Sequence, residues 1–480
     1  MSDSLLDSAH AGAAAVRGGL LRVGGYGFGV IVTVLSGVVL FRHLGVDDAG
    51  RYVLVLSIVT LAAGITDVGL SSIGVRELAL REGGDRERFM RNLLGLRVAF
   101  TVTGMGLACA YAALAGLGGR LVLGTAIAGV GILAQNLQST YATALMADLR
   151  LGWVTAIDVV RQVLTALAIV GLAVAGATLL PFYAIAPLAG AVAVGLTAWR
   201  VRRSVPLLPA LHVAEWRSLL VQTLPFALAT AVTAVYFRLG ILVVNQLSNA
   251  HQTGLFGASF RIIEVLIIVP QMMVGAVLPI FARAARDDHD RLAYGLGLVV
   301  QVSLIAGILV AGGFVIAAPV VIDIVAGPGF SGAVPVLRLH AVALFFSFAG
   351  APYSYALLSL HHHRSILLAS ATGLVTMIVA LVVLVPSHGA EGAAIGMVIG
   401  EAVLWLTGLM LVRRSGLDVR VTRPWRLAAA AAVAAIPGIL LGPIAGAVVA
   451  LPLFAGLVLA LGAVPRELLD ALPARLRSIP

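Results

Sequence analysis

Three charged residues stand inside two apolar stretches near the middle of the chain. Arg238 lies in the first stretch, and Arg261 and Glu264 lie in the second, beyond a polar turn at residues 248–254. A charge at the centre of a bilayer costs roughly 2.5–3.5 kcal/mol on insertion scales, so these residues need a chemical reason. Guanidinium groups hold phosphates through strong, charge-assisted hydrogen bonds. The residue types therefore suggest a site for an anionic group.

The distance of each arginine from the turn supports this hypothesis. Arg238 lies seven residues before Asn245, and Arg261 lies seven residues after Gly254. At about 1.5 Å per helical residue, both are expected about 10 Å below the same membrane face, where they could share one anion. The sequence has no acidic residue within four positions of Arg238, which makes it the stronger candidate for substrate contact. In the structural alternative, Arg261 pairs with Glu264 one helical turn away.

A polar stripe follows one face of the second candidate helix, at residues 52–74. Its members recur at steps of three and four residues and are Ser57, Thr60, Gly64, Asp67 and Ser71. Such a stripe is expected to face protein or water rather than lipid, although small-residue packing between helices is an alternative. In either case Asp67 needs a partner or water. It is a candidate for coupling transport to an ion.

Other apolar stretches also carry isolated charges. Asp158 and Arg161 form an i,i+3 pair, and Glu401 stands alone in mid-span, where it can be protonated or paired across the bundle. The candidate anion-binding residues are Arg22, Arg161, Arg238 and Arg261. The candidate cavity or coupling residues are Asp67, Asp158, Glu264 and Glu401. By contrast, Arg97 and Arg338 lie near span ends and are expected to extend to the membrane surface.

The overall composition places all these residues in a membrane. The 480 residues are 60% hydrophobic and 11% charged, with a mean hydropathy of +1.05. All 32 basic residues are arginines, so a phosphate-binding P-loop and Schiff-base chemistry, which both need lysine, are excluded. The single cysteine, Cys109, leaves no place for a disulfide. The consecutive residues His361, His362 and His363 cannot all face one metal ion on a helix.

About fourteen continuous apolar runs predict an all-α polytopic membrane protein. Their approximate limits are 21–41, 52–74, 93–117, 121–145, 153–175, 181–199, 218–245, 255–281, 292–318, 334–359, 365–386, 391–412, 427–446 and 448–464. The fourth run is unusually polar at residues 135–140, which predicts a helix that lines water or is held by interhelical hydrogen bonds. No loop exceeds about 20 residues, so no room remains for a soluble catalytic domain.

Arginines concentrate in alternate loops. When both termini are placed in the cytoplasm, 24 of the 32 arginines fall on the cytoplasmic side. Only Arg42, Arg51 and Arg120 fall outside, and the remaining five lie within spans. Because cytoplasmic loops of membrane proteins are rich in basic residues, this bias predicts cytoplasmic N- and C-termini.

Several stretches resemble the polysaccharide flippases. They are YFR at 236–238, NQLSNAHQTGLFGASFRIIE at 245–264, LPIFAR at 278–283, GITDVGL at 64–70, GPGFSGAVPVLRLHAVALFF at 327–346 and PSHGAEGAAIGMVIGE at 386–401. The resemblance is to O-antigen and exopolysaccharide transporters of the multidrug/oligosaccharidyl-lipid/polysaccharide exporter superfamily, and it covers residues 20–412. Where these proteins carry an acidic residue after the YFR arginine, this chain has Leu239 and Gly240.

The resemblance implies two pseudo-repeated six-helix lobes followed by two extra helices. We assign them to residues 1–204, to 205–426, and to 427–480 with a cytoplasmic tail. The sequence agrees, because the turn LGVDDAGRY at 44–52 matches LSNAHQTGLF at 247–256 with one residue inserted. Inverted or parallel repeats of this kind are typical of transporters that work by alternating access.

The resemblance further implies a plasma-membrane transporter rather than an enzyme. Its cargo would be an oligosaccharide on undecaprenyl pyrophosphate, with polysaccharide polymerases and glycosyltransferases as partners. No cofactor, metal, nucleotide or nucleic acid is expected. The first alternative is a cation-coupled multidrug exporter of the same superfamily, which Asp67, Glu264 and Glu401 would suit. The second is a membrane-embedded glycan ligase or polymerase, for which only Asp47 and Asp48 stand in an outer turn.

Overall fold

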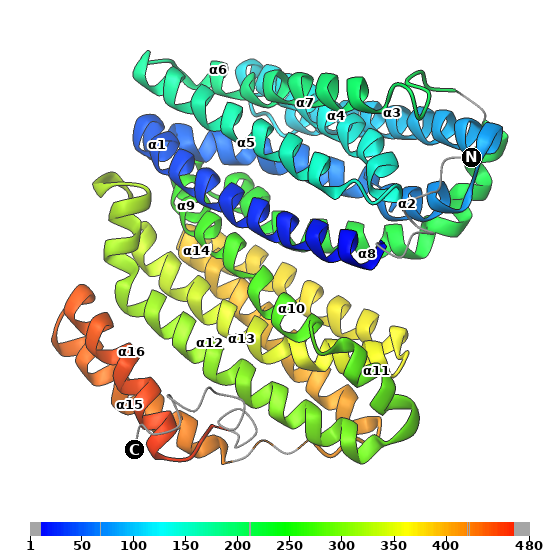
Figure 1. The fold of residues 1–480 in the computed structure, drawn as a ribbon. Coiled ribbons are helices and arrows are strands. Elements are labelled where there is room, and N and C mark those ends of the chain that lie inside the picture. Colours follow the sequence, from blue (N-terminus) through cyan, green and yellow to red (C-terminus); the bar gives the residue numbers. More distant parts are fainter. Residues whose placement is uncertain (1–10, 68, 211–212, 420, 422, 465–480) are drawn as a thin grey trace. The chain divides into compact units, whose positions relative to one another are not determined.

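The structure is a computed structural model that describes residues 11–67, 69–210, 213–419, 421 and 423–464. Every regular element in these ranges is helical, and no strand occurs in them (Figure 1). The predicted cytoplasmic tail, with Arg466, Arg475 and Arg477, lies outside the described residues. The all-α fold predicted from the sequence is confirmed.

The first half of the chain forms eight helices. They are α1 (Ala11–Asp67), α2 (Leu70–Leu80), α3 (Gly83–Leu114), α4 (Gly119–Ala147), α5 (Leu151–Val174), α6 (Leu179–Tyr183), α7 (Ile185–Val201) and α8 (Val213–Leu247). The second half forms eight more and one 3₁₀ turn. They are α9 (Ala250–Leu266), α10 (Ile268–Gly275), α11 (Leu278–Asp287), α12 (His289–Val325), η2 (Pro328–Phe330), α13 (Ala333–Ser359), α14 (His363–Arg414), α15 (Pro424–Leu440) and α16 (Pro443–Ala460).

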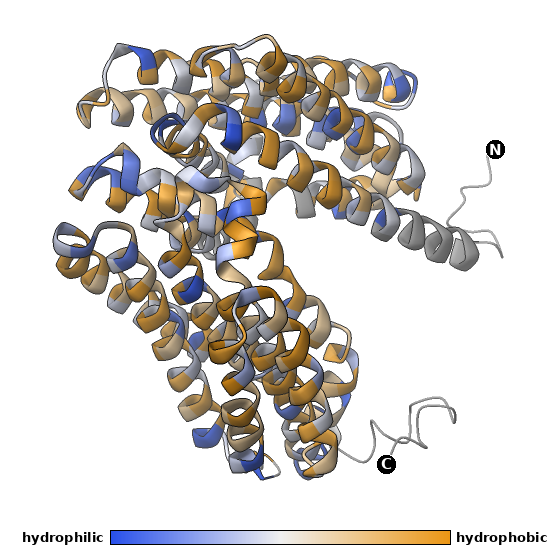
Figure 2. Ribbon diagram, turned by 90° about the vertical axis from the view of Figure 1, so that its left-hand side faces the viewer, coloured by the Kyte–Doolittle hydropathy of each residue, from blue (hydrophilic) through white to orange (hydrophobic). Residues whose placement is uncertain are grey.

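These helices supply fourteen candidate membrane spans. Within the described residues, ten helices are long and apolar enough to cross a bilayer. Two of the ten, α1 and α14, have 57 and 52 residues, and a backbone break divides each into two spans. Two shorter apolar helices, Ala231–Leu247 within α8 and Pro424–Leu440, complete the fourteen. Hydrophobic residues run along most helices in Figure 2, as a bilayer requires.

Glycines make the breaks in the two longest helices. Gly45 has φ 69° and ψ 179°, and Gly389 has φ 52° and ψ −125°. Residues with a Cβ adopt such positive φ values at a cost, whereas glycine does not. At Gly389 the space is also occupied, because an added Cβ would lie 2.6 Å from Oε1 of Gln252. That oxygen accepts a hydrogen bond from the backbone N–H of Ala390 at 2.9 Å.

The chain folds into two compact units, Met1–Leu242 and Val243–Pro480. In the first unit, buried residues such as Met90, Leu93 and Leu145 join α2, α3 and α4 into one core. In the second unit, residues such as Leu292 and Tyr353 join the ends of α12, α13 and α14. The lobe boundaries at residues 204 and 426 stay predictions.

The order of elements repeats between the two units. In the first unit, the span that ends at Asp67 is followed by the short helix α2 and then by the long helix α3. In the second unit, α9 and α10 are followed by the short helix α11 and then by the long helix α12. The repeat seen in the sequence of the turns thus extends to the helices that follow them.

The predicted orientation can be tested with single cysteines in a Cys109→Ser background. Gly84 and Asp290 are exposed in the first turns of α3 and α12, beside arginine-rich connections, and Gly119 is the exposed first residue of α4, at a helix end expected outside. An impermeant thiol reagent applied to intact cells is expected to label Gly119→Cys but neither Gly84→Cys nor Asp290→Cys. Both should react once the membrane is opened. External labelling of Gly84→Cys or Asp290→Cys in intact cells would reverse the orientation.

Candidate functional site

A buried ion pair joins α1 to α3 in the first unit. Arg97 is only 1% exposed, and its Nη1 donates to Oδ1 of Asp67, whose side chain is 31% exposed. Arg97 Nε also donates to Oγ1 of Thr140 on α4, at 3.1 Å. The expectation that Arg97 extends to the membrane surface is therefore wrong. Its guanidinium turns inward because a carboxylate and a hydroxyl are available there.

The polar residues of α4 make hydrogen bonds to neighbouring helices. Asn136 donates from Nδ2 to Thr101 Oγ1 on α3 at 2.9 Å. On another side of α4, Gln138 donates from Nε2 to Oδ1 of Asp158 on α5 at 3.5 Å. The sequence left two interpretations of this polar helix open, a helix that lines water and a helix held by interhelical hydrogen bonds. These contacts favour the second interpretation.

A second charged cluster brings together three of the predicted site residues. The guanidinium charges of Arg161 and Arg22 both act on the carboxylate of Asp158. Arg22, on α1, is exposed and places Nη1 3.8 Å from Sδ of Met146. Arg161 has a buried Nε without a hydrogen-bond partner among the described residues. The cluster thus holds two cations and one anion.

Close packing of α1 against α5 positions this cluster. At Gly29, an added Cβ would lie 2.0 Å from Oε1 of Gln162, the residue that follows Arg161. At Gly25, an added Cβ would lie 2.2 Å from Cγ2 of Thr155. Gly25 and Gly29 therefore mark a close contact between α1 and α5, on the face of α1 that also carries Arg22 three residues before Gly25.

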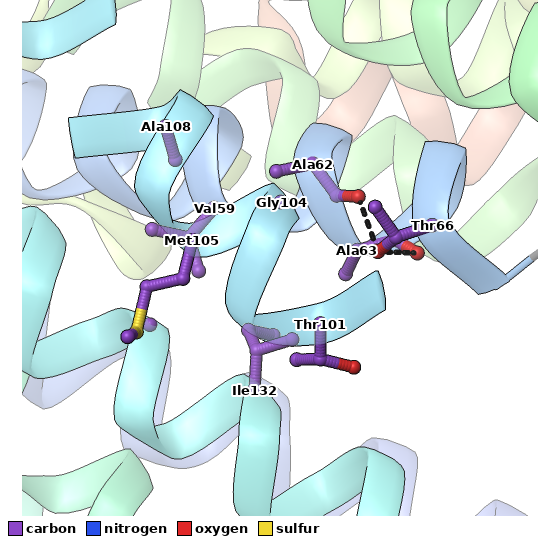
Figure 3. A pocket seen from close by; sticks show the side chains of 10 residues that line it. Val59, Ala62, Ala63, Thr66, Thr101, Gly104, Met105, Ala108 and Ile132 are labelled. Carbon is purple, nitrogen blue, oxygen red and sulfur yellow. Dashed lines mark hydrogen bonds between the residues drawn. The ribbon is translucent and has the colours of Figure 1, made fainter. Parts of the chain in front are cut away.

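A small pocket in the same unit lies among α1, α3 and α4 (Figure 3). Its walls are mainly apolar, with Val59, Met105 and Ile132 among them, and its only hydroxyl groups belong to Thr66 and Thr101. The Thr66 hydroxyl is already bonded, because it donates to the carbonyl oxygen of Ala62 at 2.7 Å. No charged side chain lines this pocket, so it is not a site for an anionic group.

In the second unit, Arg261 and Glu264 form an ion pair. Arg261 Nη1 lies 3.0 Å from Oε2 of Glu264, and the two side chains are 47% and 26% exposed. The i,i+3 pairing predicted as the structural alternative is therefore present. Arg238 is half-buried on α8 and belongs to the first unit, whereas Arg261 belongs to the second. That both arginines contact one anion stays a prediction.

Two further polar groups are buried in the second unit. Glu401 is 7% exposed and accepts a hydrogen bond from the hydroxyl of Ser347 on α13 at 2.8 Å. His340 is fully buried, with Nδ1 2.6 Å from Oγ of Ser259 on α9 and its ring against Phe256. No sequence signal singles out Ser347, Ser259 or His340, because each is an isolated polar residue in an apolar run.

Within the part of the chain that the structure describes, no three His, Cys, Asp or Glu side chains gather closely enough to hold a metal ion. The polar constellations are ion pairs and hydrogen-bonded pairs on facing helices. Such an arrangement can bind charged groups inside the membrane, and the Arg22, Asp158 and Arg161 cluster has positive charge in excess.

Comparison with known families gives two matches. The model of a polysaccharide biosynthesis protein family matches residues 39–335. The model of the lipid II flippase MurJ matches residues 243–460, which lie within the second unit. No curated protein sequence matches the chain.

Solved structures share the fold at low sequence identity. A lipid II flippase MurJ in an inward closed conformation aligns with a TM-score of 0.70 and 11% identity, covering 91% of this chain and 98% of that chain. An inward-facing MATE family multidrug resistance transporter of the MOP superfamily aligns with a TM-score of 0.68 and 16% identity, covering 83% and 98%. A MOP superfamily transporter from Pyrococcus furiosus aligns with a TM-score of 0.58 and 17% identity, covering 84% and 95%.

Proposed function

The chain belongs to the polysaccharide biosynthesis protein family, and we propose that it flips a lipid-linked oligosaccharide across the plasma membrane. The cargo is an oligosaccharide on undecaprenyl pyrophosphate, destined for cell-surface polysaccharide. The chain acts by alternating access and not as an enzyme, with its N- and C-termini in the cytoplasm. The match to the lipid II flippase model over residues 243–460 supports a lipid-linked cargo.

The observation that carries this proposal is the charged cluster of Arg22 on α1 with Asp158 and Arg161 on α5. A diphosphate that leaves water loses its hydration, and only cationic donors inside the protein can replace that hydration. Arg22 and Arg161 supply two guanidinium groups against one carboxylate, Asp158. The Nε of Arg161 is buried without a hydrogen-bond acceptor among the described residues, and a phosphate oxygen becomes its acceptor when alternating access opens this part of the unit.

Buried acidic residues favour a second candidate, the cation-coupled multidrug exporter. Glu401 is buried in mid-span, where it accepts a hydrogen bond from Ser347, and a buried carboxylate in a membrane span suits the binding of a proton or a cation. Asp67 supports the exporter less, because its carboxylate already forms an ion pair with the guanidinium of Arg97. The two candidates differ in the sign of the cargo.

The ligase or polymerase alternative has less support. Of the two acidic residues in the outer turn, Asp48 lies 2.6 Å from Arg51, and both side chains are substantially exposed, at 39% and 46%. An exposed i,i+3 ion pair is typical of a solvated turn. The described residues at this turn therefore offer no arrangement that suggests group transfer.

Reconstitution of the purified chain in liposomes tests the proposal. The liposomes carry a fluorescent undecaprenyl-pyrophosphate oligosaccharide, and its exposure on the outer leaflet is measured with a glycan-modifying reagent that cannot cross the bilayer. The chain is expected to move the labelled lipid between leaflets much faster than liposomes without protein do. Arg161→Gln is expected to slow this movement at least tenfold, because one of two phosphate contacts is lost.

The matched control is Gln162→Glu, which places a charge of the opposite sign beside the cluster while Arg161 is retained. It is expected to slow movement of the lipid less than Arg161→Gln does. Uptake of a cationic drug by the same liposomes, without movement of the lipid-linked oligosaccharide, would favour the exporter and refute the flippase.

A further inference from the structure

The short helix α11 has one apolar face and one basic face. Phe281 and Ala284 are buried in the core of the second unit, where they pack with Leu292 of α12. Arg283 and Arg286 are exposed, as expected for the opposite side of the helix. Ile280, one turn before Arg283, is 59% exposed as well. Exposed basic and apolar side chains in adjacent positions are typical of a helix at the membrane–water interface.

The helix lies where such an interface must be. It connects α10, the end of one span, to α12, the start of the next, and in Figure 1 it lies at the end of α12 where that helix begins. The turn between α13 and α14 also reaches this end, because Phe281 shares its core with Leu357. A hydrogen bond of 3.2 Å between His362 Nδ1 and Ser415 Oγ joins that turn to the end of α14.

Positive charge accumulates around α11. Four further exposed arginines belong to the ends of helices in this part of the unit, and they are Arg291, Arg364, Arg413 and Arg414. Four acidic residues lie in the same segments, Asp287, Asp288, Asp290 and Asp418, and Asp288 keeps its charge although its Oδ1 accepts the backbone N–H of Arg291 at 2.9 Å. Six arginines against four carboxylates leave the surface around α11 with a positive excess.

The corresponding short helix of the first unit satisfies its arginine internally. Arg81, which caps α2, lies 2.9 Å from Oε2 of Glu77, and its guanidinium lies 4.2 Å from the ring centroid of Phe89. On α11, by contrast, neither Arg283 nor Arg286 has an ion pair or hydrogen bond from its side chain to any residue that the structure describes. Their charges are available to an anion outside the chain.

We propose that α11 binds the headgroups of anionic phospholipids. Arg283 and Arg286 contact the lipid phosphate, and Ile280 lies against the first carbons of the acyl chains. A lipid fits better than an acidic protein, because the basic side chains stand beside an exposed isoleucine at the level where two spans end. This proposal is independent of the cargo that the protein carries.

Titration of the detergent-solubilised full chain with phosphatidylglycerol or phosphatidylcholine tests this site, with bound lipid counted by native mass spectrometry. The wild-type chain is expected to prefer phosphatidylglycerol. A basic residue near a membrane surface strengthens binding to anionic lipid roughly fivefold, so Arg283→Gln with Arg286→Gln should weaken phosphatidylglycerol binding by at least about tenfold. Binding of phosphatidylcholine should not change. Ile280→Ser should weaken the binding of both lipids alike.

The matched control is Arg88→Gln with Arg91→Gln, which removes two exposed arginines from the first turns of α3 in the other unit. This control should keep the preference for phosphatidylglycerol, and melting temperatures should be unchanged in both double variants because all four side chains are exposed. An equal loss in the two double variants would mean general charge attraction and would overturn the site. Absence of any preference in the wild-type chain, or unchanged lipid binding in Ile280→Ser, would also overturn it.

Discussion

The variant Asp67→Leu is expected to lose most of its folded protein, whatever its effect on transport. The substitution leaves the guanidinium of Arg97, which is 1% exposed, without its carboxylate partner. Removal of one partner of a buried ion pair typically costs about 3–5 kcal/mol, and the partial exposure of Asp67 points to the lower end. The free energy of unfolding of a native protein is only about 5–15 kcal/mol, so a loss of this size removes a large part of it. The measurement is the amount of monodisperse protein and its melting temperature after solubilisation.

The control for this prediction removes both charges. Asp67→Leu with Arg97→Met replaces the pair by apolar groups of similar length, which is often neutral for stability. The double variant is therefore expected to recover protein that the single variant loses. Transport by the recovered protein then shows whether the carboxylate itself is needed. Normal stability of Asp67→Leu alone would contradict the assignment of the pair as a structural contact.

This ion pair changes the interpretation of the polar stripe on α1. From the sequence, Asp67 was expected to face a polar interior and to be a candidate for ion coupling. Ser57, at the start of the stripe, is 1% exposed, and a Cβ added at Gly64, the member next to Asp67, would lie 2.5 Å from the Cβ of Ala234. Both contacts are with protein. Coupling through Asp67 stays a prediction, and a stabilising role has direct structural support.

Much of the fold could be predicted because it follows from local sequence. A span is defined by some twenty consecutive apolar residues, so hydropathy alone predicted about fourteen spans, and ten described helices are long and apolar enough to cross a bilayer. The pairing of Arg261 with Glu264 was also predictable, because residues three apart on a helix are neighbours wherever the helix lies. The sequence resemblance likewise predicted the family that the comparisons confirm.

The remaining contacts depend on how distant helices pack. Arg97 and Asp67 are 30 positions apart, and Ser347 and Glu401 are 54 apart. No periodicity within one helix indicates which face of another helix it meets. For this reason the sequence does not predict the direction of the Arg97 side chain, since a position near a span end permits either an inward or an outward rotamer. The partner decides between them.

Removal of the Arg261 and Glu264 side chains together is expected to abolish export while leaving the protein intact. The pair is accessible, at 47% and 26%, and accessible ion pairs contribute at most about 1 kcal/mol to stability. Charges in a membrane span that are not needed for stability are expected to serve transport. The double variant Arg261→Ala with Glu264→Ala avoids stranding the carboxylate. Accumulation of lipid-linked oligosaccharide in cells, normalised to protein level, measures the loss.

Two further variants separate the chemistry of Arg261 from its charge. Arg261→Lys keeps the charge but loses the planar fork that binds a phosphate through two donors, so it should restore export only partly. Arg238→Ala tests the other predicted arginine by itself, and loss of a phosphate contact from a poorly hydrated site should reduce export at least tenfold. Full export by Arg261→Lys would indicate that only charge matters. Full export by the double Arg261 and Glu264 variant and by Arg238→Ala, at normal protein levels, would remove both arginines from the cargo path.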